Sequence, residues 1–344
     1  MIISSGMKVF VTGASGRIGK NVVKKLASSG FQVKAFDRTV TEQKLPDVEY
    51  VSGDINDFNL LLSQIKGSDA VVHLAALAGP EIGTAQDIIR INVLGTFNVF
   101  RTAVENGVKK IVQASSINAL GAGYNIRKFK VQYFPIDEEH PSSLTDPYAL
   151  SKKMDEEIAE YFWCRDSLPS VSLRFPSVID TDSLKFKLPE RELVTKAIIE
   201  LEEMDVEERM KLIGEVFGNM ESINREWKKS KNLKADVPNI QMKTVKERFI
   251  LWSGKEFWTY LDFRDCVQSV LKSLHADIEG SHSLFVSAAK NGTGFETKRL
   301  ISIFFPDVQE FKREIIGFES AVSIDKAVKL IGFAPEHTIK PVEK

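Results

Sequence analysis

The sequence predicts an α/β protein, with a doubly wound parallel sheet followed by a smaller, mostly helical C-terminal region. Three observations support this fold class. The first half of the chain alternates β-rich runs with helix-periodic stretches, and a glycine-rich turn joins the first strand to the first helix. A charge-rich stretch without strand periodicity follows at about 183–246. Strands joined through helices require right-handed crossovers, and therefore a parallel sheet covered on both faces.

Each predicted strand of the first half is a short apolar run bounded by turn residues. In chain order these runs are Lys8–Thr12, Phe31–Phe36, a weak strand that starts at Tyr50-Val51, Ala70–Leu74, Ile111–Ala114 and Val171–Phe175. Between them, apolar residues recur at helical spacing and predict helices at Lys20–Ser29, Asp87–Asn106 and Tyr148–Trp163. Gly30 follows the first helix as a C-terminal cap.

The second half of the chain is patterned differently. The best predicted helices of the charge-rich stretch are Glu190–Glu203 and Asp205–Phe217. After it, we expect strands at Phe249–Trp252, Trp258–Phe263 and His282–Val286, with a helix at Arg264–His275 between the last two. A nucleotide-binding region followed by a smaller, more variable one is the simplest organisation.

Composition excludes several classes of protein. The 344 residues carry 46 lysines and arginines against 47 aspartates and glutamates, so a generic nucleic-acid binder is disfavoured. The cysteines, Cys164 and Cys266, are too few for a disulfide framework or a cysteine zinc site, and we expect both to be core thiols. No apolar run is long enough for a membrane span, and the N-terminus lacks the pattern of a signal peptide. A cytoplasmic protein with no membrane partner is expected.

Three glycines point to a dinucleotide. Gly13, Gly16 and Gly19 lie between a strand and a helix, where glycine permits a tight turn, a close approach of the backbone to pyrophosphate, and close helix packing. The N–H groups of the helix N-terminus attract the phosphates. Asp37 follows Gly19 by 18 residues, at the end of the second strand, where a carboxylate binds the ribose hydroxyls and repels a 2′-phosphate. NAD is therefore favoured; the neighbouring Arg38 keeps NADP open.

A serine, a tyrosine and a lysine suggest the chemistry. Tyr148 and Lys152 are four residues apart and share one helix face. The lysine ammonium and a nicotinamide ring would lower the pKa of the phenol, making it a general base. Ser116 lies at the carboxyl end of the fifth strand, where ligands bind in open α/β sheets, and its hydroxyl can hold the substrate oxygen.

With these pieces in place, the chain resembles the extended short-chain dehydrogenase/reductase family, in its NAD-dependent epimerase/dehydratase branch. The matching segments are Thr12–Gly19, Asp54-Ile55, His73–Ala76, Asn92–Thr96, Ser115-Ser116, Tyr148–Lys152 and Leu173–Phe175, with weaker similarity at Thr259–Asp265 and Gly332–Pro335. The resemblance implies a Ser116, Tyr148 and Lys152 triad, with Asn92 in a proton relay and Lys152 also holding the nicotinamide ribose. It also implies a homodimer formed through the helices near 87–106 and 148–164.

The expected site follows from these matches. Residues 1–180 are expected to form the NAD-binding Rossmann domain, to which a segment at about 249–290 returns, and 181–248 and 291–344 the substrate-binding cap. Expected cofactor contacts are Gly13, Ser15, Gly16, Arg17, Ile18, Gly19, Asp37, Arg38, Asp54, Ile55, Leu74, Ala75, Ala76, Asn92, Ala114, Tyr148, Lys152 and Phe175. Expected substrate contacts are Ser116, Ile117, Asn118, Tyr148, Pro176 and Ser177.

Departures from the family pattern concern the substrate. Ile117-Asn118 replaces the Asp-Glu pair of the dehydratases, and Leu120-Gly121 the tyrosine-glycine of many sugar epimerases. Pro176–Asp180 replaces the Asn-x-Tyr-Gly-Pro stretch of nucleotide-sugar enzymes, and Trp258 the arginine that often binds the diphosphate. A sugar or nucleotide-sugar epimerase working through a keto intermediate leads, and an NAD(P)-dependent dehydrogenase of a sugar, sugar acid or related carbonyl compound is the alternative.

The remaining candidates carry less weight. A dehydratase is disfavoured, and so is a non-catalytic nucleotide sensor, which would generally lose the tyrosine–lysine pair. His73 is expected to be a packed histidine, and the other histidines show no metal-ligand spacing, so no metal is expected. The charged run Lys228–Lys234 is expected to be a solvated face.

Overall fold

A computed structural model describes residues 4, 6–124, 129–182, 188–229 and 244–339 of the chain, with side chains omitted at 188–191, 220 and 223–229. Its centre is a seven-stranded sheet in which every neighbouring pair of strands is parallel. The strands are β1 (Lys8–Thr12), β2 (Gln32–Asp37), β3 (Val48–Ser52), β4 (Ala70–His73), β5 (Lys110–Ser116), β7 (Ser170–Phe175) and β10 (Ser281–Phe285).

Their spatial order is β10-β7-β5-β4-β1-β2-β3, so the chain starts at the middle of the sheet and winds outward in both directions. This confirms the doubly wound prediction. The six strands expected in the first half are all in this sheet, and the strand expected at His282–Val286 is its seventh.

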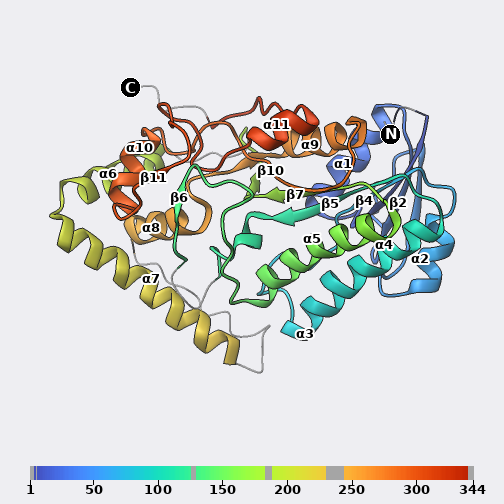
Figure 1. Ribbon diagram of the computed structural model, residues 1–344, viewed down its shortest axis with the longest axis horizontal. Coiled ribbons are helices and arrows are strands. Elements are labelled where there is room, and N and C mark those ends of the chain that lie inside the picture. Colours follow the sequence, from blue (N-terminus) through green and yellow to red (C-terminus); the bar gives the residue numbers. More distant parts are fainter. Residues whose placement is uncertain (1–3, 5, 125–128, 183–187, 230–243, 340–344) are drawn as a thin grey trace.

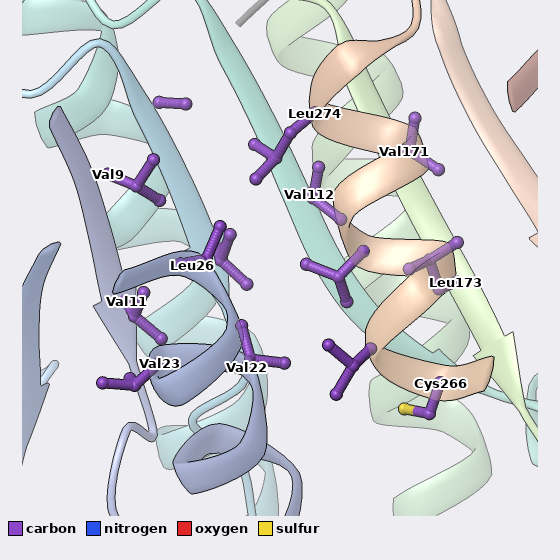
Figure 2. Packing of buried hydrophobic residues seen from close by; sticks show 14 of the residues in the cluster. Val9, Val11, Val22, Val23, Leu26, Val112, Val171, Leu173, Cys266 and Leu274 are labelled. Atoms are coloured by element: carbon purple, nitrogen blue, oxygen red, sulfur yellow. The ribbon is translucent and has the colours of Figure 1, made fainter. Parts of the chain in front are cut away.

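Helices cover both faces of the sheet (Figure 1). On one face lie α1 (Arg17–Ser28), α9 (Phe263–His275) and α11 (Asp325–Ile331); on the other lie α2 (Phe58–Ile65), α4 (Gly95–Glu105) and α5 (Pro147–Asp166). Because successive strand residues point to opposite faces, Val9 and Val11 join the core under α1 and α9, while Phe10 joins the core under α4 and α5. Figure 2 shows the first of these cores, with Val22 and Leu26 of α1 on one side and Leu274 of α9 on the other.

The long helix expected at Asp87–Asn106 is present but changes its winding twice. Ala85–Ile88 forms α3, Ile89–Leu94 forms a π-helical segment, and α4 continues from Gly95. The π segment holds Asn92 fully buried. Such wide turns often occur at functional sites.

A second core, which we call the cap, is built largely from the chain beyond β7, together with the segment around β6. Its helices are α6 (Leu188–Glu203), α7 (Val206–Lys229), α8 (Val245–Glu256) and α10 (Thr297–Phe304), and its short strands are β6 (Tyr133–Phe134), β8 (Val178–Ile179), β9 (Leu261–Asp262) and β11 (Glu310–Phe311). Figure 1 shows these helices gathered at one end of the molecule, with α7 running along its edge. Their apolar side chains form a separate cluster around Phe257 and Trp258.

Two predicted strands are wrong. Phe249–Trp252 lies in α8, because Thr244 and Glu247 form a reciprocal capping box that starts a helix there. The run Trp258–Phe263 contributes only the two-residue β9, since Phe257 and Trp258 both adopt left-handed backbone angles that cannot continue a strand. The predicted helices Glu190–Glu203, Asp205–Phe217 and Arg264–His275 are confirmed, the second extending to Lys229.

The side chains expected in cores divide into correct and incorrect cases. His73 is buried and Cys266 is buried, as expected, but Cys164 is exposed on α5. Cys164 follows the apolar residue Phe162 by two positions, which turns it away from the helix face that packs on the sheet. The charged run Lys228–Lys234 lies outside the residues whose side chains the structure describes. Within the described part of the chain, no helix has the length and apolar character needed to cross a bilayer.

Candidate active site

The glycine turn after β1 is shaped by close contacts that only glycine allows. A Cβ on Gly13, whose φ is +67°, would lie 2.6 Å from the Ala75 backbone nitrogen. A Cβ on Gly19 would lie 2.1 Å from the Gly13 carbonyl oxygen, so a side chain there would push α1 away from the loop. Gly16 is the N-cap of α1 and has no side-chain cap, which leaves the first-turn N–H groups available to an anion.

A cavity of about 150 Å³ opens beside this turn, at the carboxyl ends of the central strands. It brings together nine of the predicted cofactor residues: Gly13, Gly16, Asp37, Arg38, Asp54, Ile55, Leu74, Ala75 and Ala76. The carboxylates of Asp37 and Asp54 suit the hydroxyls of a ribose, and the apolar lining residues suit the flat face of a base. The residues present therefore fit the adenosine end of a dinucleotide, with Gly13, Gly16 and the start of α1 left for the pyrophosphate.

Other expected cofactor contacts lie elsewhere. Ser15 donates its backbone N–H to Asp37 at 3.0 Å and lines an adjoining groove. The Arg17 guanidinium lies over the Phe263 ring and donates to the Val178 carbonyl at 3.3 Å, so it reaches toward β8. Ile18 packs against the core under α1.

Ser116 and Tyr148 meet at the carboxyl end of β5. Tyr148 is the second residue of α5, which begins with Pro147 and is capped by the Asp146 carboxylate accepting from the Ala149 N–H at 2.8 Å. The Ser116 hydroxyl hydrogen-bonds the Tyr148 phenol and also accepts from the Asn118 N–H at 3.1 Å.

The electrostatics of Tyr148 differ from our expectation. Burial raises the pKa of its phenol above the ordinary value of 10, and the Lys152 charge and the Ser116 hydrogen bond act in the opposite direction. Lys152 therefore exerts the expected influence, but desolvation by the protein outweighs it. A lowered pKa requires positive charge beyond that of Lys152.

Lys152 is buried and doubly held. Its Nζ donates to the Ala114 carbonyl at 2.9 Å and forms an ion pair of 3.1 Å with Asp155. Asn92 lies apart from this pair. Its side chain exchanges hydrogen bonds of 2.8 and 3.1 Å with the Leu77 backbone and donates to the Ser151 hydroxyl at 2.9 Å. The structure thus gives Asn92 a role in fixing the loop after β4. Its other partner, Ser151, is the residue directly before Lys152 on α5.

The expected substrate residues differ in their exposure. Ile117 was expected to line the site, but its side chain is buried in the cap cluster. The short helical turn Ile117–Leu120 directs it there. Pro176 is buried at the end of β7, next to exposed Ser177. The Ser177 hydroxyl donates to Glu256 of α8 at 2.6 Å, which ties the sheet edge to the cap.

Three residues around the site were not predicted from the sequence: Tyr124, which contacts Tyr148, and Lys255 and Glu256 of α8. The Tyr124 ring meets the Tyr148 ring edge-on, with centroids 6.3 Å apart, and the Lys255 ammonium lies 5.1 Å from the Tyr124 centroid. Burial lowers the pKa of Lys255 and raises that of its neighbour Glu256. The only sequence signal was the position of Tyr124 shortly after Ser116; Lys255 and Glu256 come from a helix over 100 residues further along the chain.

Trp258, which stands where the family often has a diphosphate-binding arginine, is turned into the cap core. Its side chain is fully buried, packs edge-on against Phe304 and Phe305, and donates its indole N–H to the Ser253 hydroxyl at 2.7 Å. The position therefore offers no cation to a substrate.

Curated proteins are similar to this chain in sequence. A curated putative UDP-glucose 4-epimerase of Methanocaldococcus jannaschii is 32% identical over 176 residues, covering 49% of this chain and 55% of that protein. An L-arabinose 1-dehydrogenase (NAD(P)(+)) of Haloferax volcanii is 28% identical over 198 residues, covering 56% of this chain and 75% of that protein. This chain thus matches only about half the length of the epimerase.

Solved structures agree with the fold. The UDP-glucose 4-epimerase of Thermotoga maritima superposes with a TM-score of 0.61 at 17% identity, covering 97% of this chain and 95% of that one. A sequence model of the NAD dependent epimerase/dehydratase family matches residues 9–284, which include the glycine turn, the serine, tyrosine and lysine, and the returning strand β10. The chain therefore belongs to the NAD dependent epimerase/dehydratase family.

Proposed function

We propose that this protein is an NAD-dependent oxidoreductase of a carbohydrate hydroxyl or carbonyl group. NAD, when bound, accepts the hydride that leaves the substrate carbon. Tyr148 takes the proton of the substrate hydroxyl, and Ser116 holds the reacting oxygen by its hydroxyl. Lys152 stabilises the phenolate and binds the nicotinamide ribose. The meeting of Ser116, Tyr148 and Lys152 at one strand end supports these roles.

The burial of Trp258 favours net oxidation or reduction over epimerisation. An epimerase must turn its keto intermediate over while another part of the substrate stays anchored, and a diphosphate held by arginine is such an anchor. Here that position faces the cap core, so it supplies no such clamp. A dehydrogenase of a free sugar, sugar acid or related compound therefore becomes the first candidate.

A nucleotide-sugar epimerase remains the second candidate. The M. jannaschii relative, with 32% identity over 176 residues, favours it. Under either function, we propose that the cap carries substrate specificity, with Tyr124, Lys255 and the Ser177–Glu256 pair beside the reacting group.

We further propose that the cofactor is NAD rather than NADP. The Asp37 carboxylate at the cavity would accept hydrogen bonds from the ribose hydroxyls and repel a 2′-phosphate. Arg38 lines the same cavity and could attract that phosphate, so this preference rests on Asp37.

We propose that two copies associate through the α3–α4 and α5 face. A groove between these helices is lined mainly by apolar side chains, among them Val93, Phe97 and Ile158. Leu94 and Met154 on its rim are 49% and 37% exposed. A continuous exposed apolar surface of this kind is typical of a protein interface.

A substrate screen decides between the two candidate functions. Free sugars, sugar acids, and UDP- and dTDP-sugars are incubated with the enzyme and NAD, and both NADH release and epimeric product are scored. We expect NADH to accumulate with a sugar or sugar acid. Epimeric product from a nucleotide sugar without NADH release would establish the second candidate instead.

A further inference from the structure

Asp155 is a buried carboxylate in the active site that the proposed mechanism has not used. It lies three residues after Lys152 on α5, is 1% exposed, and its Oδ2 forms the 3.1 Å ion pair with the Lys152 ammonium. An ammonium has three N–H donors. Asp155 and the Ala114 carbonyl take two of those of Lys152, which leaves one for a ligand.

A chain of hydrogen bonds stands behind Asp155. The carboxylate is hydrogen-bonded through Oδ2 alone, to Lys152, while the Thr96 side chain of α4 lies beside it and lowers the pKa of Asp155; the Thr96 Oγ1 lies 2.9 Å from His73 Nε2. His73 Nδ1 lies 2.6 Å from Thr12 Oγ1, which accepts from the Ala75 backbone N–H at 3.3 Å. The chain thus runs from the wall of the dinucleotide cavity to Thr96, beside the carboxylate.

The donors of this chain can be ordered. The Thr96 hydroxyl lowers the pKa of Asp155, as a donor turned toward a carboxylate does, and a hydroxyl that offers its hydrogen there accepts from His73 Nε2–H. Burial lowers the pKa of His73 to about 3, so the ring is neutral and its Nδ1 accepts from the Thr12 hydroxyl. Every donor from Ala75 onward therefore points toward Asp155, an arrangement that stabilises its ionised form.

The charges around Asp155 leave Lys152 as its counterion. The titratable or charged groups that face it are Lys152, Tyr148 and Glu156 on α5, His73 on β4 and Arg174 on β7. Glu156 and Arg174 satisfy each other through two hydrogen bonds of 2.8 Å. His73 is neutral, so Lys152 is the one cation in ion-pair distance of Asp155 among the residues described.

We propose that Asp155 is a positioning residue, which fixes the Lys152 ammonium at Ala114 so that its remaining N–H can bind the nicotinamide ribose. This inference rests on the ribose-binding role proposed for Lys152. Protonation of Asp155 breaks the ion pair and loosens Lys152. Because burial raises the pKa of Asp155 to about 6, its charge is lost just below neutral pH.

NADH binding, followed by fluorescence from pH 5 to 8, tests this without a substrate. In the wild type we expect affinity to fall as the pH drops through about 6. In Asp155→Asn we expect affinity to be about tenfold lower at pH 8, the cost of misplacing one hydrogen bond from a charged group, and this pH step to disappear. Unchanged affinity and an unchanged pH step in a folded Asp155→Asn protein would overturn the proposal.

Two further variants test the role of Thr96 and provide a control. Thr96→Val keeps the carboxylate but removes the hydroxyl that lowers its pKa, so the pKa of Asp155 rises and the step moves to higher pH; an unmoved step contradicts the influence of Thr96 on Asp155. The matched control is Glu157→Gln, an exposed carboxylate of the same helix, which should bind NADH as the wild type does. Melting curves by circular dichroism establish that each variant is folded. A missing hydride-transfer activity would overturn the proposed function and leave this binding result intact.

Discussion

The Asp37 carboxylate accepts the backbone N–H of Ser15 at 3.0 Å, so the end of β2 is tied directly to the glycine turn. Its other oxygen accepts from the Thr39 N–H at 3.2 Å. One carboxylate thus shapes the phosphate turn and presents charge to the ribose end of the cavity.

Asp37→Asn should therefore change cofactor preference. We expect NADH affinity to fall about tenfold, through loss of the charged acceptor, and NADPH affinity to rise, because repulsion of the 2′-phosphate is removed. Fluorescence titration with each cofactor measures both. Asp47→Asn, an exposed carboxylate outside the cavity, is the control. Tighter binding of NADPH than NADH by the wild type would contradict the preference for NAD.

Tyr148→Phe should remove turnover and spare the cofactor. Loss of a general base costs about 10²–10⁴-fold in kcat, whereas the ring that packs against Tyr124 is kept. Turnover is measured on the substrate found by the screen, and NADH affinity by fluorescence. Tyr161→Phe, on an exposed part of the same helix, should stay near wild type. Full activity in Tyr148→Phe would exclude Tyr148 as the base.

Leu94→Asp should separate the proposed dimer. A carboxylate placed on the apolar groove must be desolvated on association, which opposes pairing of the two copies. Size-exclusion chromatography with light scattering should give a dimer for the wild type and a monomer for the variant. Leu193→Asp, an equally exposed leucine on α6, should remain dimeric. A monomeric wild type at micromolar concentration would be inconsistent with this interface.

His73 should make the protein less stable in acid. Its folded pKa of about 3 lies below the ordinary 6.5, so between these values the unfolded chain binds a proton that the folded one does not. The free energy of unfolding therefore falls as the pH drops below 6.5. Urea midpoints at pH 7 and pH 4.5 should differ less in His73→Gln than in the wild type, and His282→Gln serves as the control. Equal differences in His73→Gln and wild type would rule out this linkage.

Lys110→Met should destabilise the contact between β5 and the C-terminal end of α9. The Lys110 side chain crosses from β5, fully buried, and its ammonium donates to the carbonyls of Ser273, Leu274 and Ala276, which end α9. Leaving these acceptors unsatisfied should cost about 1–3 kcal/mol in unfolding free energy. Lys109→Met, whose exposed ammonium pairs with Asp69, should cost about 1 kcal/mol or less. Equal costs in urea unfolding would contradict the role of Lys110.

The sheet could be predicted because its signals are local. Each strand of the first half is a continuous apolar run, and Gly13, Gly16 and Gly19 are needed by contacts within one turn. The same locality placed Ser116, Tyr148 and Lys152 at one strand end. Where a pattern is repeated over a few residues, sequence alone gives the element.

The cap could be predicted only in part: its helices α6 and α7 were expected, whereas α8 was not. The aromatic run around Phe249 suits a strand or a helix, and the capping box at Thr244 decides between them. The apolar face of α8 is explained only by its partners α6 and α10, which are separated from it in sequence. The contact between Lys255 of α8 and Tyr124 likewise joins residues that are far apart in sequence, so no local pattern predicts it.

The effect of burial on pKa values could not be predicted from the sequence either. The spacing of Tyr148 and Lys152 indicates their pairing, but the raised pKa of the phenol arises from everything packed around it. Likewise Asp155 and Thr96 lie on different helices, so their proximity, with His73 bonded to Thr96, is a property of the folded chain.

The return of the chain to the sheet at β10 has a consequence for how the protein can be divided. The cap helices α6, α7 and α8 come between β7 and β10 in the chain, yet these two strands are paired along five residues. A backbone cut between β7 and β10 would therefore yield two fragments that each hold part of one sheet and bury complementary apolar faces of α1 and α9. Such halves are suited to reassembly from separate polypeptides, whereas a truncation at residue 180 would leave β7 as an open edge.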